Sequence, residues 1–275
     1  HDIDAMTEVL KMAKEVEGPV IIHTLTQKGK GYALAEKSST KYHSVGPFNL
    51  ESGELNVSPK NSYSKAFGEA LIKLSEKDEK IVAITAAMPE GTGLKCFAER
   101  FKERFFDVGI AEQHAVTLAA GMASNGLKPV FAVYSTFLQR AFDQVIHDVC
   151  IQNLPVVFAI DRAGIVGDDG ETHQGINDIS YLSMIPNIHI VAPKCLEEVE
   201  IILEWALNKN APVAIRYPRG GNVIDSLVPI KKVEEGKWEE INSGVKVCII
   251  ATGKMVQNAM MAKDILYEKG LNPSI

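Results

Sequence analysis

Cysteine, basic charge and long apolar runs are all scarce in this sequence, and each absence excludes a class of protein. The four cysteines are far apart, with neither the spacing of a zinc site nor that of a disulfide framework. No apolar run is long enough to span a bilayer, and no signal peptide is recognisable. The formal net charge of −6 provides no broad basic field to attract nucleic acid. We therefore expect a reduced, cytoplasmic protein with no nucleic-acid or membrane partner.

Two common nucleotide-binding motifs are missing as well. Gly91-Thr-Gly93 lacks the lysine and hydroxyl residue that end a phosphate-binding P-loop, and no dinucleotide fingerprint is present. ATP-dependent and NAD-dependent enzymes are therefore disfavoured.

What the 275 residues do contain is a regular alternation of apolar runs and helical patterns. Most of the runs are continuous, as in strands buried on both faces of a parallel sheet. Helices are predicted over Ala111–Asn125 and Thr136–Cys150 from the spacing of their apolar residues. The fold class is therefore α/β, with a parallel sheet and right-handed crossovers. The predicted strands are Pro19–Thr26, Lys80–Thr85, Phe105–Ile110, Pro129–Tyr134, Pro155–Ile160, Ile188–Ala192, Pro212–Tyr217 and Val245–Ala251.

Two segments interrupt this alternation. The polar connection from Gln27 to about Ser62 is too long for an ordinary loop of an α/β unit, and the segment from Ile224 to Gly244 is irregular and charged. The chain also begins at His1 without a methionine and ends at Ile275, where the pattern of another strand begins. We expect an internal piece of a larger protein, with domain boundaries in these two segments.

The first candidate site residue is Glu112, in the motif Asp107–His114. It lies in the first turn of a predicted helix directly after an apolar strand. Ligands of open α/β sheets bind at the carboxyl ends of the strands. A carboxylate there can act as general acid and base against a ring nitrogen. It can also simply complement the helix dipole, and for an isolated glutamate that is the favoured interpretation.

The second motif, Tyr134–Arg140, combines an aromatic residue and an arginine. Helical spacing places Phe137 roughly 125° from the centre of the core stripe and Arg140 roughly opposite that centre. Phe137 could stack on a flat ligand or pack against a neighbouring domain. Arg140 could bind an anion or form an i,i+3 ion pair with Asp143.

The third motif, Asp161–Gly175, is a long loop with four glycines and five charged residues, and loops of this length often carry function. Arg162 can bind a phosphate through two hydrogen bonds, and His173 can exchange a proton near neutral pH. The acidic residues do not have the spacing of a calcium loop. The fourth motif, Arg216–Gly220, adds Arg219. Arginines at strand ends are often only solvated, but several on one sheet edge of an acidic protein indicate an anion pocket.

With these residues in view, the chain resembles the 1-deoxy-D-xylulose-5-phosphate synthase family, thiamine-diphosphate enzymes of the transketolase superfamily. All four motifs match that family, and they separate it from transketolase itself. The resemblance covers essentially all 275 residues, although the chain is less than half the family's usual length. Further matching motifs are Lys30–Glu36, Tyr42-His43 and Thr85–Gly91.

The resemblance implies a homodimer that binds thiamine diphosphate. Glu112 would contact the pyrimidine nitrogen and Phe137 would stack on the ring. Tyr32, Met88 and Ile110 complete the expected cofactor contacts. The family's Gly-Asp-Gly…Asn motif, which binds magnesium and the diphosphate, is absent here. No metal ligand is therefore expected in this chain, and the magnesium ligands are expected in a missing first domain.

The resemblance also implies the reaction: decarboxylation of pyruvate and condensation with D-glyceraldehyde 3-phosphate, a transferase step feeding isoprenoid precursor, thiamine and pyridoxal synthesis. Arg162, Arg219 and Tyr134 would hold the phosphate of the aldehyde. The residues expected to manage protons and the substrate carboxylate, beside Glu112, are His43, Asp169, His173 and Arg140.

In the family's architecture, residues 1–30 would be the tail of the diphosphate-binding domain, 31–61 a linker, 62–225 the pyrimidine-binding domain and 226–275 the start of the C-terminal domain. Such a fragment would be inactive alone. Two alternatives remain open. One is the β subunit of a 2-oxoacid dehydrogenase, which would not need the phosphate-binding arginines. The other is a non-catalytic fragment that offers only the pyrimidine half of the site and a dimer surface.

Overall fold

The computed structural model describes residues 1–39, 41–43, 45–54, 61–224 and 227–275, and within them not the side chain of Asp168. The chain divides into two compact units, residues 1–58 and 59–275. The boundary expected after residue 225 lies outside the described residues.

The described residues of the first unit form two helices, α1 (Ile3–Lys14) and α2 (Ala33–Lys37). Asp2 caps α1 by accepting a hydrogen bond from the Ala5 amide at 2.9 Å, and none of the residues of α1 is buried. The strand predicted over Pro19–Thr26 is wrong, because this segment has no regular secondary structure. Its apolar side chains have no strand beside them within the described residues of this unit; Ile21, for example, is 96% exposed.

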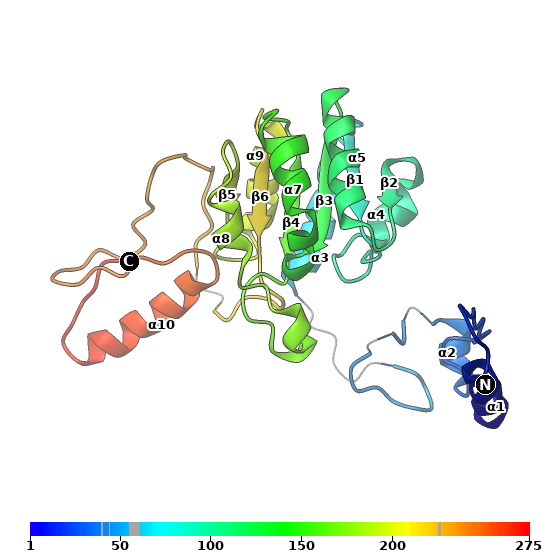
Figure 1. Cartoon of the computed structure of the whole chain (residues 1–275). Coiled ribbons are helices and arrows are strands. Elements are labelled where there is room, and N and C mark those ends of the chain that lie inside the picture. The colour runs from blue at the N-terminus through cyan, green and yellow to red at the C-terminus, as the bar shows by residue number, and fades with distance from the viewer. Residues whose placement is uncertain (40, 44, 55–60, 225–226) are drawn as a thin grey trace. The chain divides into compact units, whose positions relative to one another are not determined.

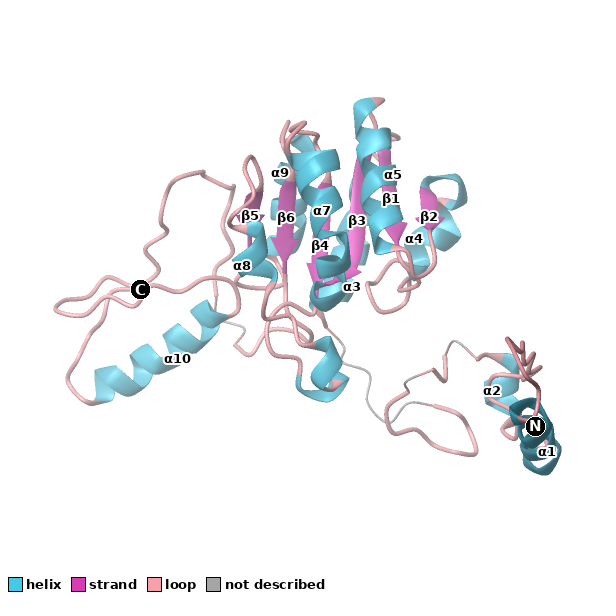
Figure 2. Ribbon diagram, in the orientation of Figure 1, coloured by secondary structure: helices cyan, strands magenta, loops and turns pink. Residues whose placement is uncertain are grey.

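The second unit is built on a six-stranded sheet in which every pairing is parallel (Figures 1 and 2). The strand order is β2-β1-β3-β4-β6-β5, so β6 lies between β4 and β5. The predicted parallel α/β fold is thus confirmed. The strands are β1 (Ile81–Thr85), β2 (Phe105–Asp107), β3 (Lys128–Tyr134), β4 (Val157–Asp161), β5 (His189–Val191) and β6 (Val213–Arg216).

Helices cover both faces of this sheet and create two cores. Successive residues of a strand point to opposite faces, so Val130 of β3 joins one core and Phe131 joins the other. The first core is covered by α3 (Tyr63–Ser75), α4 (Lys95–Arg100) and α9 (Glu198–Asn208). The second is covered by α5 (Glu112–Ser124), α8 (Asp178–Leu182) and the helical run from Ser135 to Cys150.

This last run is less regular than the sequence predicts. It consists of α6 (Ser135–Leu138), the 3₁₀ turn η2 (Gln139–Ala141), α7 (Phe142–Gln144) and the π-helical η3 (Val145–Cys150). The residue that precedes it is Tyr134, and no side-chain hydrogen bond caps it. The 3₁₀ and π turns change the number of residues per turn. Ala141 and Cys150 are fully buried, and Phe142 and Ile146 are partly buried against the second core.

The C-terminal segment adds α10 (Met255–Glu268) and a small third core around Cys195 and Val256. The strand predicted over Val245–Ala251 is wrong, since only Cys248 pairs, in an isolated bridge with Ser274. Gln257 of α10 donates a hydrogen bond to the Lys194 carbonyl, between β5 and α9, at 2.7 Å. The remaining 3₁₀ turns are η1 (Lys102–Arg104), η4 (Gly167–Asp169) and η5 (Glu171–His173).

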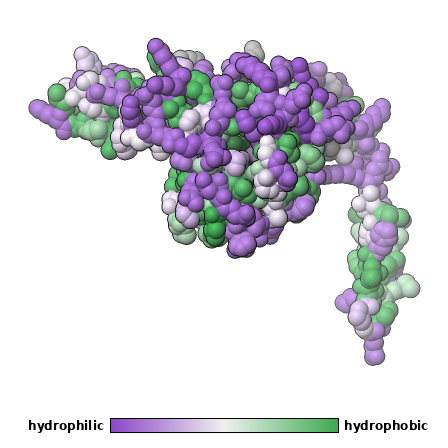
Figure 3. Space-filling view, turned by 90° about the horizontal axis from the view of Figure 1, so that it is seen from above, coloured by the Kyte–Doolittle hydropathy of each residue, from purple (hydrophilic) through white to green (hydrophobic). Residues whose placement is uncertain are grey.

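Among the described residues, no helix is long and apolar enough to cross a membrane. Hydrophobic residues do reach the surface, and on the face seen in Figure 3 they lie among hydrophilic ones.

Candidate functional site

Glu112 is the first residue of α5 and is almost completely buried, with a relative exposure of 2%. Its carboxylate accepts a hydrogen bond from Arg140 Nη1 at 2.7 Å. Within the described residues Arg140 forms no ion pair with Asp143, which was the alternative expected from their spacing. Two predicted site residues, 28 positions apart in sequence, are thus in direct contact.

Aromatic rings continue the site from this ion pair. The Arg140 guanidinium lies 4.8 Å from the centre of the Phe137 ring. The edge of the His173 ring approaches Phe137 at a centroid distance of 5.2 Å, and Tyr134 stacks beside Phe137 at 5.9 Å. Phe137 is half-buried and packs against the second core. The rings therefore bridge the carboxylate and the arginines at the other end of the site.

Arg162 is held on several sides. Its guanidinium lies 4.3 Å from the centre of the Tyr134 ring, and Nη1 lies 3.0 Å from Asp161 Oδ2. Nη1 also donates to the Gly91 carbonyl at 2.6 Å and to Ser64 Oγ at 3.1 Å. Burial raises the pKa of Tyr134, although the positive charge of Arg162 acts in the opposite direction. Tyr134 is therefore a neutral phenol that can donate a hydrogen bond.

Asp169 lies between the two arginines that the sequence assigns to phosphate binding. Arg219 Nη1 is 2.8 Å from Asp169 Oδ1, and Arg162 Nε is 3.5 Å from Asp169 Oδ2. The structure thus brings Arg162, Arg219 and Tyr134 together, with a carboxylate of the protein beside them.

Close backbone approach explains two glycines of the site. A Cβ atom on Gly91 would lie 1.8 Å from the Tyr134 hydroxyl, and one on Gly175 would lie 2.2 Å from the Arg162 carbonyl. Arg162 itself has a φ of +56°, which is uncommon for a residue with a side chain. The loop that follows is closed by reciprocal hydrogen bonds between Gly164 and Gly175 at 2.7 and 2.8 Å.

The remaining predicted site residues are Met88, Ile110, Tyr32 and His43. Met88 is half-buried against the second core, and Ile110 is 79% exposed two positions before Glu112. Tyr32 and His43 belong to the first unit, where His43 is exposed. The Tyr32 hydroxyl donates to the Leu50 carbonyl at 2.9 Å. The structure therefore joins eight of the predicted residues in one chain of contacts, and these are Glu112, Arg140, Phe137, His173, Tyr134, Arg162, Asp169 and Arg219.

Three residues that hold Arg162 had no role in the sequence prediction. Asp161 directly precedes Arg162 at a strand end, and this adjacency could have suggested the ion pair. Ser64 donates to Asp161 Oδ2 at 2.6 Å across 97 positions, and no local pattern indicates that contact. Gly91 appeared in the motif Thr85–Gly91 and in the discussion of an absent phosphate loop, without a contact assigned to it.

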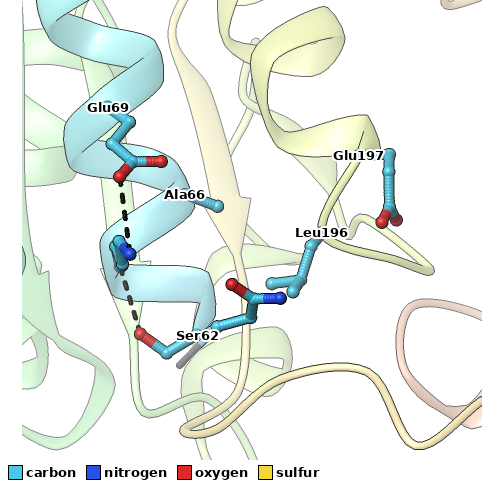
Figure 4. Close-up of a pocket in the computed structure, with 7 residues that line it drawn as sticks. Ser62, Ala66, Glu69, Leu196 and Glu197 are labelled. Carbon is cyan, nitrogen blue, oxygen red and sulfur yellow. Dashed lines mark hydrogen bonds and ion pairs between the residues drawn. The ribbon is translucent and has the colours of Figure 1, made fainter. Parts of the chain in front are cut away.

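A groove of about 240 Å³ lies elsewhere, between the start of α3 and the start of α9 (Figure 4). It contains none of the predicted site residues. On α3, Lys65 Nζ lies 3.8 Å from Glu69 Oε1, and the Lys65 amide donates to Ser62 Oγ at 3.2 Å. The groove is lined by Asn61, Ser62, Lys65, Ala66, Glu69, Leu196 and Glu197.

Residues 60–222 match the family model described as the transketolase pyrimidine binding domain. The chain belongs to this family. The matched residues include the whole sheet and all eight residues that are in contact in the candidate site.

Curated relatives cover the chain on both sides of this domain. A 1-deoxy-D-xylulose-5-phosphate synthase of Clostridium beijerinckii is 81% identical over 275 residues, and one of Clostridium botulinum is 66% identical over the same length. Each match includes 100% of this chain and 44% of the relative. The chain therefore spans less than half the length of these relatives.

Solved structures of the family have the same fold. A protein described as a split gene transketolase, inactive β4 tetramer, is 31% identical, with a TM-score of 0.70 over 78% of this chain and 69% of that chain. Transketolase from Leishmania mexicana is 19% identical, with a TM-score of 0.66 over 80% of this chain and 35% of that chain. The second likeness concerns the fold alone.

Proposed function

We propose that the chain is the pyrimidine-binding part of a 1-deoxy-D-xylulose-5-phosphate synthase, which joins a two-carbon unit from pyruvate to D-glyceraldehyde 3-phosphate. The observation that carries this proposal is the continuous contact from the buried Glu112 carboxylate, through aromatic rings, to Arg162 and Arg219. The names of relatives at 81% and 66% identity support it. They do not favour the alternative of a 2-oxoacid dehydrogenase subunit.

The donor set at Glu112 fits the aminopyrimidine ring of thiamine diphosphate. A buried carboxylate can accept a hydrogen bond from a ring nitrogen, and the exposed Ile110 side chain offers apolar surface two residues away. Phe137, Met88 and Tyr32 belong to the proposed cofactor contacts as well. When bound, the cofactor would supply the electron sink for decarboxylation.

Glu112 would hold and release one proton at its carboxylate, which accepts a hydrogen bond from the Arg140 guanidinium. Arg140 is accessible to substrate, because its side chain is 46% exposed. His173 contacts the same aromatic ring as Arg140 and is a second proposed site of proton exchange. His43, in the first unit, is proposed to serve the same purpose.

Arg162, Arg219 and Tyr134 would bind the phosphate of the aldehyde substrate. Arginine suits this task because its planar N–H groups form paired, charge-assisted hydrogen bonds to phosphate oxygens. Residues 62–225 would form the pyrimidine domain. Magnesium, a homodimer and a cytoplasmic location complete the proposal.

The direct test is an assay of the full-length protein with thiamine diphosphate, magnesium, pyruvate and D-glyceraldehyde 3-phosphate. We expect 1-deoxy-D-xylulose 5-phosphate as the product. Acyl transfer to a lipoyl acceptor, without that product, would instead identify a dehydrogenase subunit. If the cofactor-loaded protein catalyses neither reaction, the interpretation as a non-catalytic fragment remains.

We propose that the 275-residue chain alone is inactive. It has less than half the length of its relatives, and the β4 tetramer that resembles it is described as inactive. A titration with thiamine diphosphate and magnesium should give much tighter binding to the full-length protein than to this chain. Turnover by a sample whose intact mass matches this sequence alone would contradict that expectation.

A further inference from the structure

We infer that Asp169 is an internal competitor for the phosphate site, one that the incoming phosphate group must displace from Arg162 and Arg219. This inference rests on the proposed phosphate-binding function of those arginines. Its starting point is the position of the Asp169 carboxylate, 2.8 Å from Arg219 Nη1 and 3.5 Å from Arg162 Nε. A carboxylate of the protein itself thus lies beside both guanidinium groups, where the phosphate group of the substrate would bind.

The contact with Arg162 is poorly made, which leaves room for a better ligand. The distance of 3.5 Å between Arg162 Nε and Asp169 Oδ2 exceeds the usual length of an N–H···O hydrogen bond. Both atoms are buried, and among the described residues neither has a hydrogen-bond partner. One carboxylate therefore satisfies Arg219 but leaves the Nε donor of Arg162 without an aligned acceptor. A phosphate group has three acceptor oxygens and about two negative charges at neutral pH, so it can serve both arginines.

Asp169 is carried by a loop whose backbone is fixed by hydrogen bonds. The base is closed by the Gly164–Gly175 hydrogen bonds, and Thr136 Oγ1 donates to the Thr172 carbonyl at 3.1 Å. Gly170 follows Asp169 directly, with a φ of +77°, a conformation that glycine adopts without strain. The Gly170 carbonyl accepts hydrogen bonds from Gln174 Nε2 at 2.7 Å and from the His173 amide at 3.3 Å, so the backbone here is held. Rotation about the side-chain bonds of Asp169 can withdraw the carboxylate while the loop remains in place.

A carboxylate tethered to its site competes at a high effective concentration. Removal of its charge should therefore strengthen phosphate binding, although Asp169 makes a favourable contact in the unliganded protein. A residue with a purely structural role would have the opposite effect or none.

The test is calorimetric titration of the chain with inorganic phosphate at constant ionic strength. The variants are Asp169→Asn, Asp169→Ser and the control Glu171→Gln, which removes one negative charge from the same loop. Glu171 is exposed and, within the described part of the chain, pairs with neither arginine. We expect both Asp169 variants to bind phosphate at least about fivefold more tightly than Glu171→Gln, and Arg219→Ala to abolish the gain in the Asp169→Asn background.

Phosphate affinity in both Asp169 variants equal to or weaker than that of Glu171→Gln would overturn the competition. If Arg219→Ala still weakened phosphate binding to the parent chain, the proposed phosphate site would survive that result. Absence of phosphate binding in the parent and in both Asp169 variants would overturn the competition and the phosphate site together.

Discussion

The two ends of the candidate site each contain an arginine paired with a buried carboxylate, and they differ in how the arginine is held. Glu112 and Asp161 have relative exposures of 2% and 0%, and their nearest arginine nitrogens lie at 2.7 and 3.0 Å. The Arg140 side chain, however, is 46% exposed, whereas that of Arg162 is 13% exposed. Water or a ligand can therefore take the place of Arg140 beside Glu112. Water cannot readily take the place of Arg162 beside Asp161.

The different exposure of the two arginines predicts different roles for the two ends of the site. An exposed arginine gains little from an ion pair and can move when a ligand enters. A buried carboxylate that loses its partner retains the full cost of its desolvation. We therefore expect the Glu112 end to be sensitive mainly in turnover and the Asp161–Arg162 end to be sensitive also in folding.

The largest expected effect is on turnover at the first end. Glu112→Gln in the full-length protein should lower kcat by about 10²–10⁴, the usual range for loss of a general acid–base group, with little change in thermal stability. Steady-state kinetics and a melting curve measure both quantities. Turnover close to that of the parent would show that Glu112 only complements the dipole of α5.

The next largest effect is on stability at the second end. Arg162→Ala leaves the Asp161 carboxylate buried without its cation, and such losses typically cost about 3–5 kcal/mol. Arg140→Ala is the matched comparison, and its effect on stability should be clearly smaller, because water can enter the space that the half-exposed Arg140 side chain leaves beside Glu112. Urea unfolding of the two variants gives both values. Equal losses would remove the distinction between the two ends.

Arg219 should combine a small effect on stability with a clear effect on binding, since its side chain is 42% exposed. Loss of a charge-assisted hydrogen bond costs roughly 1.5–3 kcal/mol, so Arg219→Ala should raise the KM for D-glyceraldehyde 3-phosphate at least about tenfold. The KM for pyruvate should change much less. A parallel rise of both constants would indicate that Arg219 supports the fold.

The smallest effect concerns the cysteines, which report how tightly each region is packed. Burial raises the pKa of both Cys150 and Cys195 to about 12, so neither forms a reactive thiolate at neutral pH. Cys96 and Cys248 are exposed. Mass spectrometry after brief alkylation should find Cys96 and Cys248 modified in the native chain, and all four modified after denaturation. Native labelling of Cys150 would show that the π-helical turn opens readily.

The sequence predicts the sheet well because burial on both faces leaves a continuous apolar run, as in β3. Pro19–Thr26 has the same apolar character without forming a strand. Apolarity alone cannot show whether a neighbouring strand exists to accept hydrogen bonds from the backbone. The helical run after β3 was predicted in extent but not in its irregular turns, which depend on contacts with α5 and the sheet.

The candidate site was predictable where its residues stand in local motifs at strand ends. The carboxyl ends of parallel strands lie at the same edge of the sheet. For this reason the sequence alone predicts that Glu112, Phe137 and Arg162 belong to one site. The pairing of Arg140 with Glu112 depends on the placement of η2 beside α5. The approach of Ser64 to Asp161 depends on the packing of α3, so neither contact has a sequence signal.

The strand order has a consequence for the time course of folding. Because β6 lies between β4 and β5, β5 pairs only with β6. β6 is also the last of the six strands in the sequence. The strand that ends at Arg216 pairs with β4 only once the chain, after β5 and α9, has returned to the middle of the sheet. Such distant pairings are slow to form. The end of the candidate site that contains Arg162 and Arg219 should therefore mature after the Glu112 end.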